Sequence, residues 1–343
     1  MSRPTLKDVA AKAGVSYQTV SKVLNRRAQV SSSTEKRVMK AIEELNYRPN
    51  VAAQNLRQQH SNLIGYAWGE GGPLTWRPIN NRFLHSVVHH LEEQGYLVTF
   101  FTNNHRSATN GNRSNLAPYK ELFGRRQVDG FVLEHTVEND PRIAYLIKHK
   151  VPFVAFGRVR NDWDFHWVDV DGYHGIVLMV DYLLAQGHKR IGLVHWQNIA
   201  ATGYDRKSAY FDRLKSVDII PHPNWLFSGI NEFNTGAQAI HHYLSLPKAE
   251  RPTAVICVSD QIAVGAISTA ISEGLQVGQD IAITGYDDVN MARYMQPPLT
   301  TIRQPIDEAG THVARLLLAQ IHGQTVECKQ VLLKPELVVR QSA

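Results

Sequence analysis

Four side chains that can hydrogen-bond lie close together near the N-terminus, in a segment predicted to be helical. They are Tyr17, Gln18, Ser21 and Lys22. A glutamine can pair with adenine through two hydrogen bonds, and a lysine can donate to guanine. The apolar residues of the same segment, Val20, Val23 and Leu24, fall on the opposite helical face. We therefore expect the polar face to contact the edges of DNA bases.

This helix is the second of a predicted pair. Apolar residues at spacings of three and four predict a first helix, and they are Leu6, Val9, Ala10 and Ala13. Gly14 can adopt the positive φ required just after a helix, and Ser16 is a candidate N-cap for the helix from about Tyr17 to Asn25. This pattern is typical of the helix-turn-helix motif, whose second helix enters the major groove. A helical hairpin packed on the main domain is the alternative, but it does not account for the separated polar and apolar faces.

The charge of the chain is concentrated in this N-terminal segment. Residues 1–60 carry 11 Lys and Arg against 4 Asp and Glu, a net charge of +7, whereas residues 61–343 carry 26 against 27. The formal charge of the whole chain is +6. A basic segment with apolar periodicity is typical of a folded domain that binds nucleic acid and not of a disordered tail.

Two further helical segments are predicted before the main domain. The first covers residues 33–46, and the hydroxyls at 31–33 can cap it or contact phosphate. The second covers residues 50–57 after Pro49, and it is too short to be stable alone in water. We expect a DNA-binding domain over 1–48, a hinge helix and linker over 49–61, and a second domain over 62–343.

From Leu63 onward, apolar stretches of strand length alternate with segments of helix length. The predicted strands cover 63–68, 97–101, 130–133, 153–156, 191–196, 225–227, 254–258 and 281–286. Predicted helices include 83–94, 175–186, 234–246 and 262–273, with Gly95, Gly187 and Gly274 as expected C-caps. Such a βα repeat predicts parallel sheets covered on both faces. About eight strands, in two sets of roughly four, indicate an α/β domain of two lobes with a cleft between them.

Composition and motif searches exclude several function classes. The apolar stretches are too short to span a membrane, and no apolar signal region begins the chain, so we expect a cytoplasmic protein. Cys257 and Cys328 offer no metal-site spacing. The Gly-rich residues 69–73 lack the dinucleotide fingerprint, and no P-loop, nucleophile elbow or zinc motif occurs. We expect no enzymatic activity, no metal and no cofactor.

Aromatic and charged residues gather at the predicted carboxyl ends of strands and in the loops that follow. They are Trp68, Trp76, Arg158, Trp163, Trp167, Trp196, Arg206, Phe233, Asp260 and Asp287. Ligands of open α/β sheets bind at these ends. Aromatic rings cover the apolar faces of a sugar, and Arg and Asp can bind paired hydroxyls. We therefore predict a sugar in the cleft. An Arg206–Asp287 ion pair that only holds the lobes together is the alternative for these two residues.

The N-terminal motifs resemble those of the lactose/galactose repressor family of bacterial transcription regulators. The similar stretches are TLKDVAAKAGVSYQTVSKVLN, VSSSTEKRVMKAIEELNYRPN, GYDDV at 285–289 and PPLTTIRQP at 297–305. The resemblance covers essentially the whole chain and implies a headpiece followed by a domain like the periplasmic sugar-binding proteins. It also implies a hinge helix that forms on operator DNA, with Leu56 wedged into the minor groove.

The same resemblance bears on the effector. It puts Arg206, Phe233, Asp260 and Asp287 at the family's effector-contact positions. Residues 156–172 are similar to repressors of α-glucoside operons. Where the family often has Asn-Pro-Phe-Phe, this chain departs from the pattern with Asn-Asn-Arg-Phe at 80–83. Arg82 and Phe83 of this stretch are also among the expected effector contacts.

We interpret the chain as a homodimeric repressor of carbohydrate-use genes that binds a near-palindromic operator under the control of a sugar effector. The expected DNA contacts are Thr5, Leu6, Ser16, Tyr17, Gln18, Thr19, Ser21, Lys22, Asn25, Ser31, Thr34, Asn50, Ala53 and Leu56. The alternatives are a purine or nucleoside effector, activation instead of repression, a transport-type binding protein, and an enzyme of sugar-phosphate chemistry on the same fold.

Overall fold

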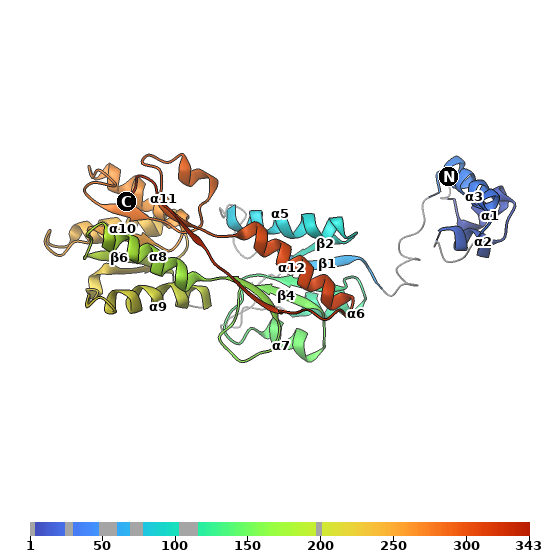
Figure 1. The fold of residues 1–343 in the computed structure, drawn as a ribbon, viewed down its shortest axis with the longest axis horizontal. Helices are drawn as coiled ribbons and strands as arrows, with labels where there is room; N and C mark the ends of the chain where they lie inside the picture. Colours follow the sequence, from blue (N-terminus) through green and yellow to red (C-terminus); the bar gives the residue numbers. More distant parts are fainter. Residues whose placement is uncertain (1–3, 25–29, 48–59, 69–77, 103–115, 197–200) are drawn as a thin grey trace. The chain divides into compact units, whose positions relative to one another are not determined.

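The computed structural model describes residues 4–24, 30–47, 60–68, 78–102, 116–196 and 201–343. The chain forms two compact units, residues 1–61 and residues 62–343 (Figure 1). No described helix is both long enough and apolar enough to cross a bilayer.

The N-terminal unit contains three described helices, α1 (Leu6–Ala13), α2 (Tyr17–Leu24) and α3 (Ser32–Glu44). Their apolar faces meet in one small core of Val9, Ala10, Ala13, Val20, Val38, Ala41 and Tyr47. Gly14 follows α1 with φ +62°, and the Thr19 N–H donates to the Ser16 hydroxyl at 3.1 Å. Both sequence predictions about this turn are therefore confirmed.

Lobe 1 of the second unit is built on a parallel sheet of six strands in the order β11-β5-β4-β3-β1-β2. These strands are β1 (Leu63–Trp68), β2 (Leu97–Thr102), β3 (Gly130–Leu133), β4 (Phe153–Phe156), β5 (His166–Val170) and β11 (Gln330–Leu333). The covering helices are α5 (Pro78–Glu93), α6 (Ala117–Gly124), α7 (Pro141–Lys148) and α12 (Ile306–Ile321). Because successive strand residues face opposite sides, Val132 packs in the core under α5 and α12, whereas Phe131 packs under α6 and α7.

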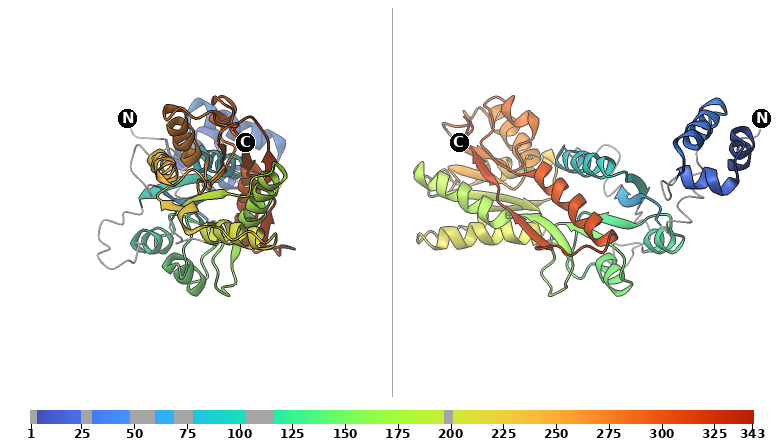
Figure 2. Two further views of the ribbon diagram at one scale, coloured as in Figure 1. Left: turned by 90° about the vertical axis from the view of Figure 1, so that its left-hand side faces the viewer. Right: turned by 45° about the vertical axis from the view of Figure 1, so that its right-hand side comes forward.

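Lobe 2 is built on a parallel sheet of four strands in the order β7-β6-β8-β9. These strands are β6 (Ile191–Trp196), β7 (Leu226–Gly229), β8 (Ala254–Cys257) and β9 (Ala282–Thr284). The surrounding helices are α8 (Gly172–Ala185), α9 (Ala201–Lys215), α10 (Phe233–Ser245) and α11 (Asp260–Ser272), with short 3-10 turns η1 (Pro223–Trp225) and η2 (Asn290–Arg293). Figure 2 shows helices on both faces of the sheets.

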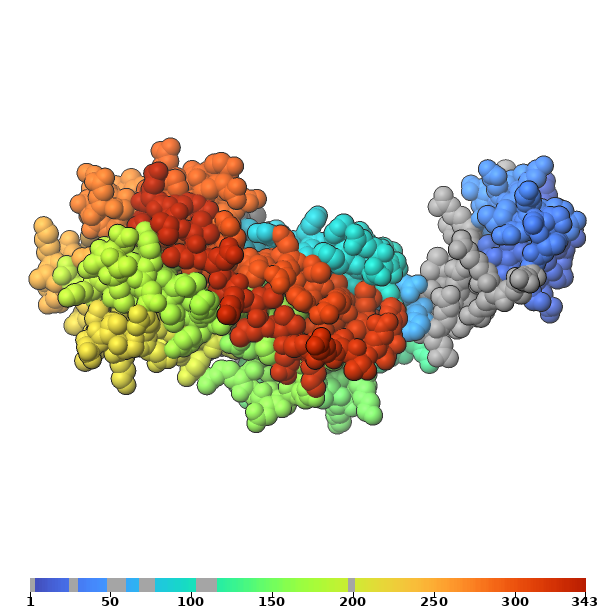
Figure 3. Space-filling view, viewed as in Figure 1, coloured from blue at the N-terminus to red at the C-terminus, as the bar shows by residue number. Residues whose placement is uncertain are grey.

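The chain crosses between the lobes three times. It passes from β5 to α8, from β10 (Thr301–Arg303) to α12, and from β11 to β12 (Glu336–Val338). β10 and β12 pair antiparallel beside the lobe 2 core. The dark red C-terminal segment runs along both lobes in Figure 1, and its atoms form a band across them in Figure 3.

The structure corrects the predicted strand list. Lobe 1 has six strands instead of about four, because β5 follows β4 without an intervening helix and β11 returns from the C-terminal part of the chain. Trp167 therefore lies in a strand and not in a loop. Trp225 lies in η1, because the strand predicted there begins at Leu226. The other predicted strands are present, and so are the predicted helices that fall within the described residues, with changes at their ends.

Two glycines allow α10 and α11 to pack with their backbones in close contact. A Cβ atom on Gly265 would lie 1.8 Å from the Phe233 carbonyl oxygen, and one on Gly236 would lie 2.0 Å from the Ile262 carbonyl oxygen. Both obstacles are backbone atoms, so they cannot turn away as a flexible side chain can. Any larger residue at these positions must separate the two helices and displace Phe233 at the start of α10.

We expect Gly265→Ala to destabilise residues 62–343 by about 1–3 kcal/mol, the usual cost of forcing extra volume into a packed interior. Urea denaturation of the full chain measures this loss. The control is Gly124→Ala, since a Cβ atom there meets no atom within 4 Å. Equal stability of the two variants would contradict the proposed role of the α10–α11 contact.

Candidate functional site

The N-terminal unit presents the polar face of α2 to solvent. Tyr17, Gln18 and Lys22 are exposed, whereas Val20 on the opposite face is completely buried. Ser21 and Thr19 are half-buried. The three exposed side chains therefore lie within the first two turns of α2, where they can face base edges.

Serine and threonine hydroxyls cap all three described helices of this unit. Thr5 caps α1, and its hydroxyl and N–H both donate to the Asp8 carboxylate at 2.7 Å. Ser31 caps α3, and the Thr34 N–H donates to its hydroxyl at 3.4 Å. Helix N-termini with exposed caps favour phosphate binding. Leu6 is half-buried and packs on the core of this unit.

Several of the expected residues lie outside the described part of the chain. Among the expected DNA contacts they are Asn25, Asn50, Ala53 and Leu56, together with the predicted hinge helix, and among the expected effector contacts Trp76. Trp68 is the last residue of β1, but its side chain is not among those that the structure describes.

The side chain of Arg206 is the central charged group of lobe 2. It lies in the second turn of α9 and is 4% exposed. One terminal nitrogen, Nη1, donates to the Val258 carbonyl at 2.6 Å, and the guanidinium carbon lies 3.5 Å from the centre of the Tyr286 ring. Neither Arg206 Nε nor the Tyr286 hydroxyl has a hydrogen-bond partner among the described residues. Since buried polar groups in proteins are nearly always hydrogen-bonded, these two groups could each bond to a water molecule or to a bound polar molecule.

Asp287 stands near Arg206 at the end of the segment after β9. Its φ of +134° is unusual for a residue with a side chain, and such backbone conformations cluster at functional sites. Gln304 Nε2 donates to its carboxylate at 2.6 Å. Burial raises the pKa of Asp287 to about 6, although the Arg206 charge and the Gln304 hydrogen bond act against this shift. The Asp287 carboxylate is thus buried and held by a protein donor, whereas the residue as a whole is half-buried.

Two other predicted effector residues have no exposed surface in this structure. Asp260 accepts hydrogen bonds from the Val289 N–H at 2.8 Å and the Thr301 hydroxyl at 2.5 Å. Burial and the nearby Asp287 raise the pKa of Asp260 to about 8. Phe83 is completely buried and stacks on Phe156 with ring centres 4.3 Å apart. Effector contact by either residue stays a prediction.

Arg158 follows β4 and lies between two carboxylates. Its Nη2 donates to Asp205 at 2.5 Å, and its Nε lies 3.8 Å from Asp169. Burial raises the pKa of Asp169 to about 6, against the opposing effect of the Arg158 charge. Local pattern does not single out Asp169, because β5 was predicted as a loop. It does not single out Tyr286 either, because nothing in the sequence pairs that ring with Arg206.

The remaining expected residues are divided between the lobes. Trp196 ends β6, half-buried against the lobe 2 core, and Phe233 begins α10 with 40% of its surface exposed. Trp163 and Trp167 are half-buried against the lobe 1 core under α6 and α7. Arg82 donates to the Asp307 carboxylate from both Nε and Nη2, so the two residues form a bidentate ion pair between α5 and α12.

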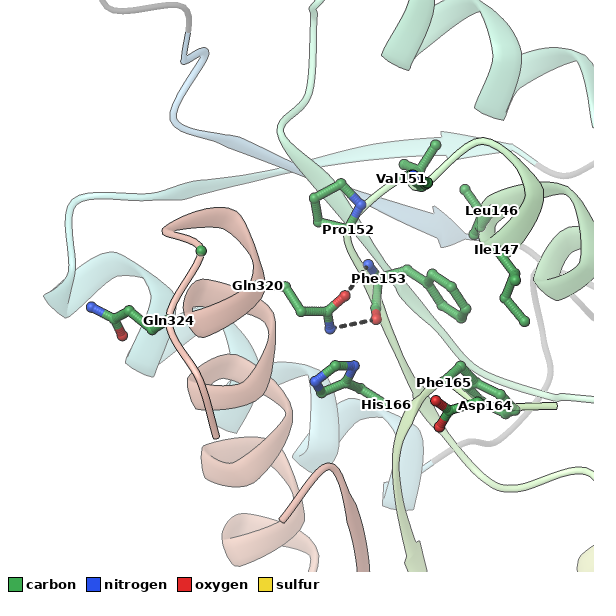
Figure 4. A pocket seen from close by; sticks show the side chains of 12 residues that line it. Leu146, Ile147, Val151, Pro152, Phe153, Asp164, Phe165, His166, Gln320 and Gln324 are labelled. Carbon is green, nitrogen blue, oxygen red and sulfur yellow. Dashed lines mark hydrogen bonds between the residues drawn. The ribbon is translucent and has the colours of Figure 1, made fainter. Parts of the chain in front are cut away.

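A separate cavity of about 470 Å³ opens in lobe 1 (Figure 4). It lies where β4 and β5 begin, beside the end of α12, and none of the expected effector residues lines it. Gln320 exchanges two hydrogen bonds with the backbone of Phe153 next to this cavity. Because ligands of parallel sheets bind at the carboxyl ends of the strands, this cavity is not the predicted effector site.

Comparison with known proteins decides the family. Residues 5–50 match the family model described as "Bacterial regulatory proteins, lacI family", and residues 180–343 match the model "Periplasmic binding protein-like domain". The chain is 32% identical over 339 residues to the HTH-type transcriptional repressor PurR of Aliivibrio salmonicida, covering 98% of each protein. The chain belongs to the lacI family of bacterial regulatory proteins.

Solved structures of the lacI family cover nearly the whole chain. The Lac repressor dimer bound to operator and the anti-inducer ONPF is 29% identical, with a TM-score of 0.85 and 99% of each chain covered. The complex of the transcriptional regulator CelR with cellobiose is also 29% identical, with a TM-score of 0.73, and the alignment covers 99% of this chain and 100% of CelR. The helical headpiece and the two-lobed α/β domain predicted from sequence are thereby confirmed, and the chain is a DNA-binding transcription regulator.

The described residues hold no group of three or more His, Cys, Asp or Glu placed to bind a metal ion. The side chains expected to contact an effector instead offer guanidinium donors, carboxylate acceptors and aromatic rings. Such groups bind a small polar molecule by hydrogen bonds and stacking.

The raised pKa of Asp169 predicts a pH dependence of stability. A carboxyl whose pKa is higher in the folded than in the unfolded chain binds its proton more tightly when folded, so protonation stabilises the fold. With a pKa of about 6 against 3.8, this contribution is present at low pH and is lost as the pH rises through about 6. Asp169→Asn cannot titrate, so its free energy of unfolding should change less between about pH 5 and pH 7 than that of the parent chain.

Urea denaturation of both chains across this range measures the difference. The exposed substitution Asp218→Asn serves as the control and should keep the parental pH dependence. Parallel curves for Asp169→Asn and the parent would show that Asp169 does not titrate in this range.

Proposed function

We propose that this regulator is a homodimeric repressor of carbohydrate-use genes whose operator affinity is controlled by an uncharged sugar bound between the lobes. The observation that carries the proposal is the buried Arg206 guanidinium, with an Nε donor that no described residue accepts from, beside the Asp287 carboxylate. Together they offer a donor and an acceptor to neighbouring hydroxyls, and the half-buried Trp196, near the Arg206 guanidinium, supplies a ring face.

The charges around the cleft favour a neutral ligand. Arg158 and Arg206 supply two positive charges, and Asp169, Asp205 and Asp287 supply up to three negative ones. Arg158 already contacts Asp205, so its charge is matched inside the protein. A phosphorylated or carboxylated ligand would add negative charge beside three carboxylates. We therefore expect free sugars to bind and sugar phosphates to be disfavoured.

The comparisons support two effector classes. CelR, at 29% identity over the full length, is a regulator in complex with cellobiose, which supports a sugar. The likeness to repressors named PurR, at 32% identity, supports a purine or nucleoside as the second candidate. The pairing of a flat ring face with Asp287 suits either class, whereas the set of three carboxylates and two guanidiniums suits a ligand with many hydroxyls.

Thermal unfolding of the full chain with a panel of ligands tests the proposal, because a ligand that binds only the folded state raises the melting temperature. The panel contains neutral mono- and disaccharides, their phosphates, purine bases and nucleosides. We expect a concentration-dependent rise with one neutral sugar. A rise with a purine and with no sugar would replace the proposed effector class.

The cognate ligand should act on operator binding through Arg206 and Asp287. We expect Arg206→Ala and Asp287→Ala to abolish the ligand's effect on operator affinity, a coupling typically worth about 1–3 kcal/mol. Operator affinity without ligand should stay near the parental value. The measurement is operator binding with and without ligand, and Arg213→Ala on the outer part of α9 is the matched control. A variant that folds and keeps its ligand response would show that the pair is structural.

The exposed face of α2 should determine the operator sequence. Gln18→Ala should weaken operator binding by about 1–3 kcal/mol and relax the preference at one base position, since Gln18 can pair with adenine through two hydrogen bonds. Binding to a set of single-base operator variants and to random DNA measures both effects. An equal loss on every sequence would instead make Gln18 a phosphate contact.

A further inference from the structure

The loop after β4 in lobe 1 contacts lobe 2 through two arginines. Arg158 donates to the carboxylate of Asp205 at 2.5 Å. Two residues later, the Arg160 guanidinium lies 3.7 Å from the centre of the Tyr204 ring. Tyr204 and Asp205 are neighbours on α9, so two adjacent residues of lobe 2 are contacted by one loop of lobe 1.

The loop is fixed to lobe 1 at its base. Gly157 has φ +105°, a conformation suited to glycine, and its N–H donates to the Val168 carbonyl at 2.8 Å. The Thr136 hydroxyl donates to the Arg158 carbonyl at 3.2 Å, and the Arg158 N–H donates to Asp169 at 3.4 Å. These hydrogen bonds fix the backbone at Arg158 within lobe 1. Less conformational entropy is therefore lost when the Arg158 side chain contacts Asp205.

The two contacts differ in their physical character. The side chains of Arg158 and Asp205 are only 22% and 18% exposed, so water screens this ion pair less than a surface pair. The Arg160–Tyr204 contact lies at the surface, where Tyr204 is 42% exposed, and it combines ring packing with cation–π attraction. Neither contact is needed to complete the core of a lobe, since none of the four residues belongs to a core cluster.

We propose that the loop of residues 157–160 is an interlobe latch. Arg158 on Asp205 and Arg160 on Tyr204 hold the lobes in the arrangement seen here. The three crossings join the lobes covalently but leave a hinge about which they can turn, as two-lobed domains commonly do. The latch adds a non-covalent restraint and thereby sets the equilibrium between lobe arrangements. This inference does not depend on the identity of the effector.

The distance between the lobes in the full chain tests the latch. One spin label is placed on the exposed Cys328 of lobe 1 and another on Lys248→Cys of lobe 2, while the buried Cys257 is shielded from labelling. An excess of unlabelled protein ensures one labelled chain per dimer. Without ligand, we expect Asp205→Asn, Tyr204→Ala and the double variant each to shift or broaden the distance distribution, with the double variant changed most.

Matched variants separate a latch from general loosening. Asp205→Glu keeps the charge, Tyr204→Phe keeps the ring, and Arg213→Gln removes an ion pair to Asp181 that joins α8 and α9 within lobe 2. All three should give the parental distribution. Tyr204→Ala changes an exposed side chain, so it tests the latch even if an Asp205 variant folds poorly. A parental distribution for the double variant, or an equal change in Arg213→Gln, would overturn the proposal.

Discussion

Parallel strand pairing is the constraint on which the candidate effector site depends. In a parallel sheet, all carboxyl ends lie at one edge, so the residues that follow the strands gather there. Arg158 follows β4, Trp196 ends β6, Phe233 follows β7 and Asp287 follows β9. Each lobe therefore contributes a cluster of side chains from segments far apart in the sequence, and the three crossings keep the two clusters on one molecule.

The local features of the fold followed from the sequence more directly than its long-range pairing. Periodicity and caps predicted α1, α2 and the turn at Gly14, because these depend on neighbouring residues. Gly95, Gly187 and Gly274 adopt the predicted positive φ just after helices. β5 was missed because its segment, HWVDV, mixes polar with apolar residues, and β11 because its partner lies about 160 residues earlier, beyond any local pattern.

The candidate site shows the same division. The sequence pointed to Arg206 at a helix start and to Asp287 at a strand end. In the structure, Arg206 stacks on the Tyr286 ring and its charge acts on Asp287. The side chains that contact the charged residues of the site could not be predicted from the sequence. Asp169 and Asp205 reach Arg158 from a strand and a helix that meet only in the folded chain. Nor could burial be predicted. Phe83 and Asp260 are completely buried, and effector contact by either residue stays a prediction.

The three crossings also bear on the order of events during synthesis. Lobe 1 needs Leu317 and its neighbours on α12 to cover one face of its sheet, and β11 to complete the row of strands. All of these are made after the whole of α8 to β10. While the ribosome is producing lobe 2, the apolar face that α5 and α12 share on the lobe 1 sheet is therefore covered by α5 alone. Vectorial folding cannot finish the first lobe before the second, so both lobes mature together, and the nascent chain is a natural client for chaperones that shield apolar surface.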